Sequence, residues 1–329
     1  MLPSEIDNYR HPASQARLTL RVDREERGHV LEGALLSPDG EAYAIARGIP
    51  RFCPIENYAE SFGFQWQKYD TVQLDSKSQW GPVSEKRLFG ESGWPREMKG
   101  QRILEAGCGM GRFTEHLAGT GAQICTFDYS AAVDANRRNN GRFANISFAQ
   151  ADIYNPPYEH GSFDRVMCIG VLQHCPSPKR AFLSLCRFLK PGGHIFVDSY
   201  KLYWACFVLG KYWLRPITRN FSPHTLHKFV RFHVGWVYPL TGALQKVIGR
   251  RGRSFSWVLG MADYRGVHGG DDATQRELSV LDTFDMLAPK YDRPATQGMI
   301  RRWFDEAGLV DFRIAPGSNG WAATGRRPT

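Results

Sequence analysis

The 329-residue sequence contains no apolar run of the roughly 18 to 20 residues that a membrane-spanning helix needs. Its first residues lack the basic and apolar regions of a signal peptide. Its seven cysteines are odd in number and form no Cys-x-x-Cys pair, so we predict neither a disulfide framework nor a metal site. Together these absences predict a cytoplasmic protein with reduced thiols.

Acidic residues are missing from one long segment. Residues 201–262 contain ten Lys or Arg and no Asp or Glu, so this segment carries the whole excess behind the net charge of +9. Aromatic residues are interleaved with these cations. Such a mixture suits a peripheral contact with the inner face of a membrane or an anionic substrate, and equally a helical cap whose basic face is only solvated. RNA is a further interpretation, ranked lower because the charge is confined to one insertion.

The stretch 102–113 combines a short apolar strand, a closing carboxylate and alternating glycines. Glu105 ends the strand, and Gly107, Gly109 and Gly111 follow at every second position. Glycine allows a tight strand-to-helix turn and a close approach of the backbone to a ligand, and the helix that follows presents free N–H groups. The spacing Glu-x-Gly-x-Gly-x-Gly differs from the dinucleotide pattern Gly-x-Gly-x-x-Gly, and this favours S-adenosylmethionine over NAD.

A second carboxylate lies one helix and one strand further along. The β-rich run 123–128 ends in Asp128, where a βαβ unit places an acid that accepts hydrogen bonds from ribose hydroxyls. An Asp at a strand end is also a common cap or turn residue. Its register with the glycine loop favours the ribose role.

Five motifs in order between residues 105 and 194 resemble the class I S-adenosylmethionine-dependent methyltransferases. The resemblance implies an α/β enzyme with a Rossmann-like, mostly parallel seven-stranded sheet covered by helices on both faces. It also implies S-adenosyl-L-methionine as the cofactor and no metal. The motifs lie at 105–111, 127–130, 151–153, 163–174 and 189–194. The cofactor-binding residues that we predict are Glu105, Gly107, Cys108, Gly109, Asp128, Tyr129, Ser130, Asp152, Ile153, Ile169, Gly170 and Trp66.

Four units follow from the order of the patterns. They are a small β-rich module (1–56), the cofactor-binding core (57–200), a basic aromatic helical insertion after the fifth strand (201–292) and the rest of the core (293–329). The first unit resembles zinc-ribbon-like modules that precede some methyltransferases, but it lacks their paired cysteines, so we predict no zinc. Alternation of strands and helices predicts a parallel sheet. Strands are expected at 102–106, 122–128, 146–150, 163–169 and 194–199, helices at 111–119, 131–140, 179–189 and 296–308, and a final strand pair at 310–314 and 320–324.

Further site residues follow from position. Asp152 comes just after the third strand, where it would bind the adenine amino group while Ile153 packs on the ring, unless it is only a turn residue. His174 follows the fourth strand and faces the reacting centre. Histidine titrates near neutrality, which makes His174 a candidate general base, but in the resembled family a Gln-His pair here often only anchors the loop.

Aromatic and acidic residues outside these motifs give weaker signals. Phe62, Phe64, Trp66 and Tyr69 have near-helical spacing, which is typical of a core stripe, although such a helix can also close over the cofactor. Asp282, Asp285 and Tyr291 are candidates for substrate contact. His268, Asp271 and Asp272 lack the spacing of a metal site.

We therefore predict a methyltransferase that acts on an oxygen of a small-molecule or glycoconjugate acceptor, in a lipid-linked or membrane-proximal form. An RNA methyltransferase that binds phosphate through the basic insertion is one alternative. A non-catalytic binding protein with the same fold is another, because a fold does not determine a function.

Overall fold

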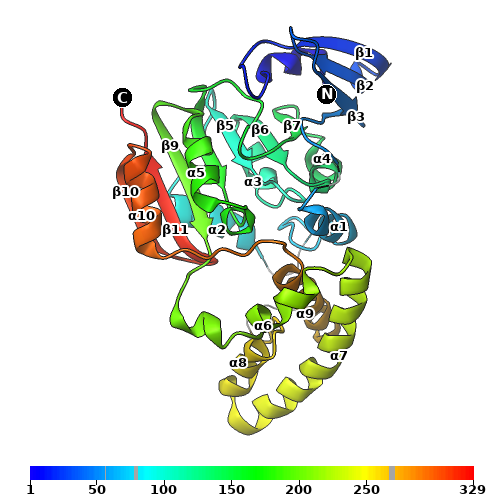
Figure 1. Ribbon diagram of the computed structural model, residues 1–329, viewed down its shortest axis with the longest axis vertical. Helices are drawn as coiled ribbons and strands as arrows, with labels where there is room; N and C mark the ends of the chain where they lie inside the picture. Colours follow the sequence, from blue (N-terminus) through cyan, green and yellow to red (C-terminus); the bar gives the residue numbers. More distant parts are fainter. Residues whose placement is uncertain (56, 78–80, 267–270) are drawn as a thin grey trace.

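Seven strands form the main sheet of the computed structural model, which describes the chain except residues 56, 78–80 and 267–270 (Figure 1). Their order is β10-β11-β9-β8-β5-β6-β7. Strands β5 to β9 are parallel, and β11 is antiparallel to both of its neighbours. The central strands are buried along nearly their whole length because helices cover both faces of the sheet. The bounds are β5 Arg102–Ala106, β6 Gln123–Asp128, β7 Ile146–Gln150, β8 Phe163–Cys168, β9 Leu189–Ser199, β10 Val310–Gly317 and β11 Gly320–Arg326.

The helices of this core are short. Most of the predicted bounds are confirmed to within one or two residues, and four differ by more. The first helix begins at Thr114 rather than directly after Gly111, and the third ends at Cys186. Strand β9 begins five residues early, at Leu189, with a register irregularity against β8, and β10 ends three residues late, at Gly317. The core helices are α1 Glu60–Lys68, α2 Val83–Ser92, α3 Thr114–Ala118, α4 Ala132–Asn140, α5 Pro178–Cys186 and α10 Gln297–Glu306, with the short helix η2 Leu172–His174.

The N-terminal residues form a separate four-stranded antiparallel sheet. It packs against the end of the main sheet near β7, where the Tyr9 hydroxyl donates to the Phe148 carbonyl at 2.9 Å. A buried ion pair joins the N-terminal unit to α4, because Arg51 lies 2.8 Å from Asp134 of that helix. The elements are η1 Pro3–Asn8, β1 Thr19–Glu26, β2 His29–Leu36, β3 Ala42–Ala46 and β4 Ile49–Pro50.

The segment after β9 forms a lobe of helices that extends from the carboxyl ends of the strands (Figure 1). Its own core contains Leu226, Val230 and Val234 of one helix and Phe284 and Leu287 of another. Ser222 and Asp271 cap the amino ends of these two helices. No helix among the described residues is long and apolar enough to cross a membrane. The elements are η3 Trp204–Phe207, α6 Gly210–Thr218, α7 Pro223–Ile248, α8 Arg250–Val258 and α9 Asp272–Leu287.

Candidate functional site

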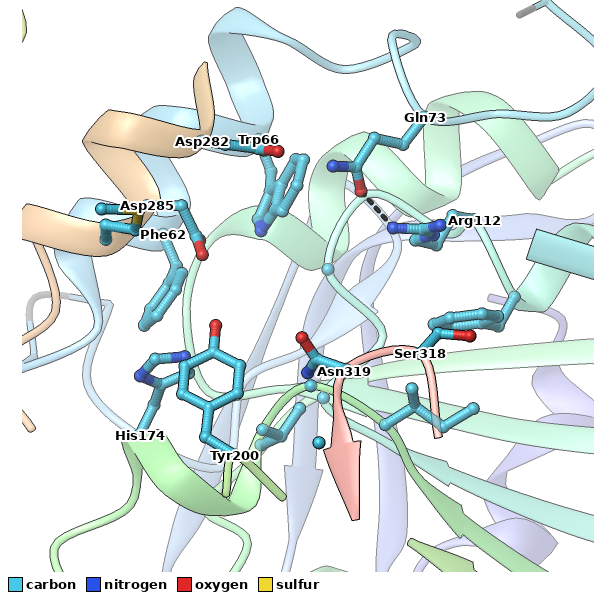
Figure 2. A pocket seen from close by; sticks show the side chains of 18 of the residues that line it. Phe62, Trp66, Gln73, Arg112, His174, Tyr200, Asp282, Asp285, Ser318 and Asn319 are labelled. Carbon is cyan, nitrogen blue, oxygen red and sulfur yellow. Dashed lines mark hydrogen bonds between the residues drawn. The ribbon is translucent and has the colours of Figure 1, made fainter. Parts of the chain in front are cut away.

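A cavity of about 1010 Å³ lies between the carboxyl ends of the parallel strands and the helical lobe. This is where open α/β sheets bind their ligands. One wall comes from the loops after β5, β6, β8 and β9, and the opposite wall from α6, α8 and α9. Figure 2 shows side chains from both walls pointing into the same space. The cavity therefore joins the predicted cofactor residues to the insertion.

The glycine loop forms the floor of the cavity. Gly107, Gly109 and Gly111 all have positive φ, which side chains other than glycine rarely adopt. A Cβ at Gly107 would lie 2.2 Å from Val171, so only glycine fits there. A Cβ at Gly109 would instead meet Trp66 at 3.5 Å, which leaves the Gly109 backbone open toward the cavity.

Asp128 lies at the end of β6, beside this loop. Its Oδ2 accepts the Gly109 N–H at 2.9 Å, and its Oδ1 accepts the N–H and hydroxyl of Ser130 at 2.8 and 2.7 Å. Oδ2 keeps acceptor capacity, because it uses only one of its two lone pairs, whereas both lone pairs of Oδ1 are used. Burial raises the pKa of Asp128, although these three hydrogen bonds oppose the shift. Asp128 and Tyr129 line the cavity, whereas Ser130 is buried behind Asp128.

Glu105 does not line the cavity. It is buried at the end of β5, where one carboxylate oxygen accepts the hydroxyls of Thr114 and Thr126 at 2.6 and 2.8 Å. Burial raises its pKa to about 7, and the two hydroxyls oppose that rise. The direct cofactor contact predicted for Glu105 is thus replaced by a positioning role, in which its carboxylate joins β5 and β6 to the start of α3.

Three asparagines of α4 hold the glycine loop from behind, and no motif in the sequence predicts this role. Asn139 donates to the Met110 carbonyl at 2.9 Å, and Asn140 donates to the Gly111 carbonyl at 3.0 Å. Asn136 donates to Thr114 at 2.8 Å. Only the packing of α4 against the loop reveals this role.

The remaining predicted cofactor residues divide into two groups. Cys108, Ile153, Ile169 and Gly170 line the cavity. Asp152 is not among its lining residues, although its neighbours on both sides are, and its Oδ1 accepts the Tyr154 N–H at 2.9 Å in a turn. The hydrogen bonding of Asp152 is therefore that of a turn residue, which is the alternative interpretation given above.

The aromatic helix α1 has two faces with different roles. Trp66 and Phe62 line the cavity (Figure 2), which agrees with the prediction that Trp66 lies at the cofactor. Phe64 instead packs against Phe284 of α9, with ring centroids 5.6 Å apart, and the Tyr69 hydroxyl lies 2.9 Å from His227 of α7. Phe64 and Tyr69 are thus core and bridging residues, and a role for them as a cofactor lid is wrong.

The part of the cavity lining that α9 forms carries two carboxylates. Asp282 and Asp285 are three residues apart, so they lie on one face of the helix, and both point into the cavity (Figure 2). Burial, followed by the charge of Asp285, raises the pKa of Asp282 to about 7, and a hydrogen bond from Tyr264 opposes the shift. Tyr291, the third predicted substrate contact, does not line the cavity and packs edge-on against Tyr58.

His174 lies at the same side, between the rings of Phe62 and Tyr200, with centroids 5.1 and 5.5 Å away. Its Nδ1 is 3.1 Å from the carbonyl oxygen of Tyr291. A carbonyl only accepts, so Nδ1 carries the hydrogen and Nε2 is the acceptor of the neutral ring. Burial lowers the pKa of His174 to about 4. The ring is therefore uncharged at neutral pH and anchors the segment around Tyr291.

A tyrosine and a lysine complete this side, and the sequence did not mark them as site residues. Tyr200 follows β9, and its hydroxyl points toward α9 (Figure 2). Lys211 of α6 places its Nζ 4.7 Å from the centre of the Tyr200 ring and 2.9 Å from Asp292. Burial and the nearby Arg215 lower the pKa of Lys211 to about 8. His268, considered above, lies outside the described residues.

The cofactor half of the site fits S-adenosylmethionine. The open backbone at Gly109, the remaining acceptor capacity of Asp128 and the apolar side chains of Ile153 and Trp66 match the amino-acid, ribose and adenine parts of that molecule. Among the described residues, no group of three His, Cys, Asp or Glu is arranged to hold a metal.

Comparisons with known proteins agree with this geometry. Residues 104–197 match the family model of the methyltransferase domain. A ubiquinone biosynthesis O-methyltransferase of Cronobacter sakazakii is 29% identical over 147 residues, which are 42% of this chain and 60% of that protein. An uncharacterized protein of a Synechococcus strain is 41% identical over 104 residues, 29% of this chain and 25% of that protein. The chain thus spans less than two thirds of the length of these relatives.

Among solved structures, phosphoethanolamine N-methyltransferase 2 of Haemonchus contortus has a TM-score of 0.47 at 14% identity, over 88% of this chain and 64% of that one. The parallel strands β6, β7 and β8 and the glycine loop joined to Asp128 lie within the segment that matches the family model. The chain therefore carries a methyltransferase domain of the class I, S-adenosylmethionine-dependent type.

Proposed function

We propose that this protein transfers the methyl group of S-adenosylmethionine to a hydroxyl oxygen of a small-molecule or glycoconjugate acceptor. The observation that carries the proposal is the single cavity that runs from the glycine loop and Asp128 to the carboxylates of Asp282 and Asp285. The bound cofactor supplies an already activated methyl group. The chain must then orient the acceptor, exclude water and remove one proton.

Orientation and exclusion of water are tasks for the aromatic walls. Phe62, Trp66 and Tyr200 approach the middle of the cavity from the core side (Figure 2), and Trp257 of α8 lines the insertion side. Because these aromatic rings are rigid, they restrict the orientations that a bound acceptor can take in the cavity. Holding reactants in line contributes about 7 to 11 kcal/mol to a transfer in favourable cases.

Removal of the proton is assigned to Asp282. A general base works best when its pKa lies near the working pH, and the pKa of Asp282 is about 7. His174, with a pKa of about 4, is a much weaker base, and its Nδ1 hydrogen is committed to the Tyr291 carbonyl. Asp282 thus replaces His174 as the candidate base, and His174 becomes a positioning residue.

The choice of oxygen rests on the need for this base. A hydroxyl acceptor must lose a proton during transfer, whereas a neutral amine can be methylated without a base. The relative from Cronobacter sakazakii is named for O-methylation, which supports the same choice for a small molecule. A non-catalytic role is less well supported, because the glycine loop, Asp128 and a carboxylate suited to proton removal lie in one cavity.

The proposal is tested by incubating the protein with methyl-labelled S-adenosylmethionine and a fractionated extract. Label is then counted in the small-molecule, polysaccharide, lipid and RNA pools. We expect label in a small-molecule or glycoconjugate pool and its loss in Asp128→Ala. Label in RNA would establish the RNA alternative, and cofactor binding without transfer to any pool would support the binding-protein alternative.

A further inference from the structure

The helical insertion exposes large apolar side chains that the proposed function does not use. Every exposed Trp and Phe among the described residues lies between residues 204 and 255. Trp204 is 78% exposed, Trp213 71% and Trp236 69%. Side chains of this size rarely gather on a free surface, and when they do they mark a site of interaction. They form two patches, Trp204, Phe207, Trp213 and Ile217 on η3 and α6, and Phe232 and Trp236 on α7, and the two patches together are called the exposed apolar surface.

Helix α7 is apolar on two opposite faces. Its buried face contains Leu226, Val230 and Val234, which pack in the core of the lobe. Phe232 and Trp236 are one turn apart on the other face, and both are exposed. A helix that packs against its own protein on a single face needs a single apolar stripe. The second stripe therefore has no partner among the described residues of this chain.

The η3–α6 part of the exposed apolar surface lies directly behind the wall of the cavity. Tyr203 and Cys206 line the cavity, whereas their neighbours Trp204 and Phe207 are exposed. The Trp213 indole donates to the Phe207 carbonyl at 2.8 Å, which fixes η3 against α6. Whatever covers this surface therefore sits next to the site.

The segment that carries this surface has charges of one sign, and one of its cations, Arg231, pairs with Glu277 of α9. Residues 201–262 contain no Asp or Glu, and four exposed cations of the segment form no ion pair with any described residue. Unpaired cations beside aromatic and aliphatic side chains are the pattern of a surface that binds anionic lipid, where apolar groups enter the acyl boundary and cations stay at the headgroups. These four are Arg219, Lys228, Lys246 and Arg251.

We propose that the helical insertion docks on an anionic lipid bilayer through the exposed apolar surface. A second copy of the chain is a poor occupant, because it would bring the four exposed cations that form no ion pair in one copy toward the same four in the other. RNA is also a poor occupant. Bases stack on aromatic rings, but aliphatic side chains such as Ile217 and Val247, 64% and 81% exposed, would gain nothing from it.

The test is sedimentation of the full chain with phosphatidylglycerol vesicles and with phosphatidylcholine vesicles. We expect binding to the anionic vesicles that weakens as salt is raised. The double substitutions Trp213→Ser with Ile217→Ser, and Phe232→Ser with Trp236→Ser, should each weaken it at least tenfold. Vesicle binding should also weaken about fivefold in each of the single variants Lys228→Gln, Lys246→Gln and Arg251→Gln. This factor corresponds to about 1 kcal/mol of binding free energy per cation at an anionic surface.

The matched control is Val22→Ser with Met299→Ser, which removes exposed apolar side chains on β1 and α10 and should leave vesicle binding unchanged. Circular dichroism verifies the fold of every variant. Absence of binding to anionic vesicles would overturn the proposal. A dimer that is seen in sedimentation velocity and dissociates in the two double variants would also overturn it. So would binding to RNA that competes with vesicle binding and is lost in the same variants.

Discussion

The Gly109 N–H donates to Oδ2 of Asp128 at 2.9 Å, which joins the glycine loop after β5 to the end of β6. The N–H groups of Gly107 and Cys108 donate to the Phe127 carbonyl of the same strand, at 2.8 and 3.1 Å, so the two elements that bind a nucleoside cofactor are held in register by several hydrogen bonds. The Ser130 amide and hydroxyl hold the other oxygen of the same carboxylate. Asp128 is therefore a candidate to bind the cofactor, and it also holds the glycine loop in place.

We predict that Asp128→Asn weakens S-adenosylmethionine binding at least tenfold. The amide group keeps the size of the side chain but replaces one acceptor oxygen with a donor, so either the Gly109 N–H or a ribose hydroxyl loses its partner. A lost hydrogen bond to a charged group costs about 1.5 to 3 kcal/mol. Isothermal titration calorimetry measures the change, and Asp305→Asn, on the exposed face of α10, is the control. Equal affinities in the two variants would contradict the assignment.

We predict that kcat/KM rises with pH and levels off above about 7. The free-enzyme base must be deprotonated, and burial with the Asp285 charge raises the pKa of Asp282 to about 7. If His174 were the base, the rise would instead lie near pH 4, where its buried ring gains a proton. A pH series with one identified acceptor separates the two. Asp282→Asn should remove the rise and lower kcat by 100-fold or more.

Asp282→Asn should also stabilise the fold. The pKa of Asp282 is raised in the native state, so the native state binds more protons than the unfolded state between pH 3.8, the ordinary pKa of an aspartate, and about pH 7. The stability of the wild type therefore falls across that window relative to the variant, and the difference is constant above it. We expect the variant to gain about 1 kcal/mol at pH 8 and none at pH 3, measured by urea unfolding. A loss of stability at pH 8 would show that the ionised carboxylate is well solvated.

Much of this fold follows from the sequence, because the strands have apolar runs of the right length and the loops have glycines at fixed spacing. The bounds of β5 and β7 are as predicted. The roles of Phe64 and Tyr69 were not predictable, because near-helical spacing places both on α1 but does not say that α7 and α9 pack there. The sequence predicts Asp282 only as a candidate for substrate contact. Its role as a base depends on a raised pKa, and that pKa depends on burial by segments that are distant in the sequence.

Gly111→Ala should destabilise the protein by about 1 to 3 kcal/mol. Gly111 has a φ of +94°, and a Cβ there would lie 2.2 Å from Oδ1 of Asn136. The matched control is Gly90→Ala in α2, where a Cβ meets nothing within 4 Å, and which should stabilise by about 0.5 to 1 kcal/mol. Thermal unfolding of both variants measures the contrast. Equal effects would contradict the description of the loop.

Arg51→Ala should cost about 3 kcal/mol, because it leaves the buried Asp134 carboxylate without its main partner. Burial alone would raise the pKa of Asp134, but hydrogen bonds from Arg51 and Arg47 outweigh it and lower the pKa. The stability that the ion pair contributes is thus present above pH 3.8, the ordinary pKa of an aspartate, and is lost as the pH falls below it. The exposed pair of Arg21 and Asp23 is the control, since Arg21→Ala should cost less than 1 kcal/mol. Urea unfolding at pH 7 and pH 3 tests both, and an Arg51→Ala cost that is the same at both pH values would contradict the role of the ion pair.

The central claim is that the cavity between the sheet and the helical lobe transfers a methyl group to oxygen. The most direct measurement uses S-adenosylmethionine with a ¹³C-labelled methyl group and records the carbon spectrum of the product that forms in an extract. At a cofactor concentration near the wild-type Kd, we predict a methoxy resonance that is reduced with Asp128→Asn and strongly reduced with Asp282→Asn. A new N-methyl resonance in place of the methoxy resonance, or a methoxy signal of full intensity in Asp282→Asn, would contradict transfer to oxygen by this site.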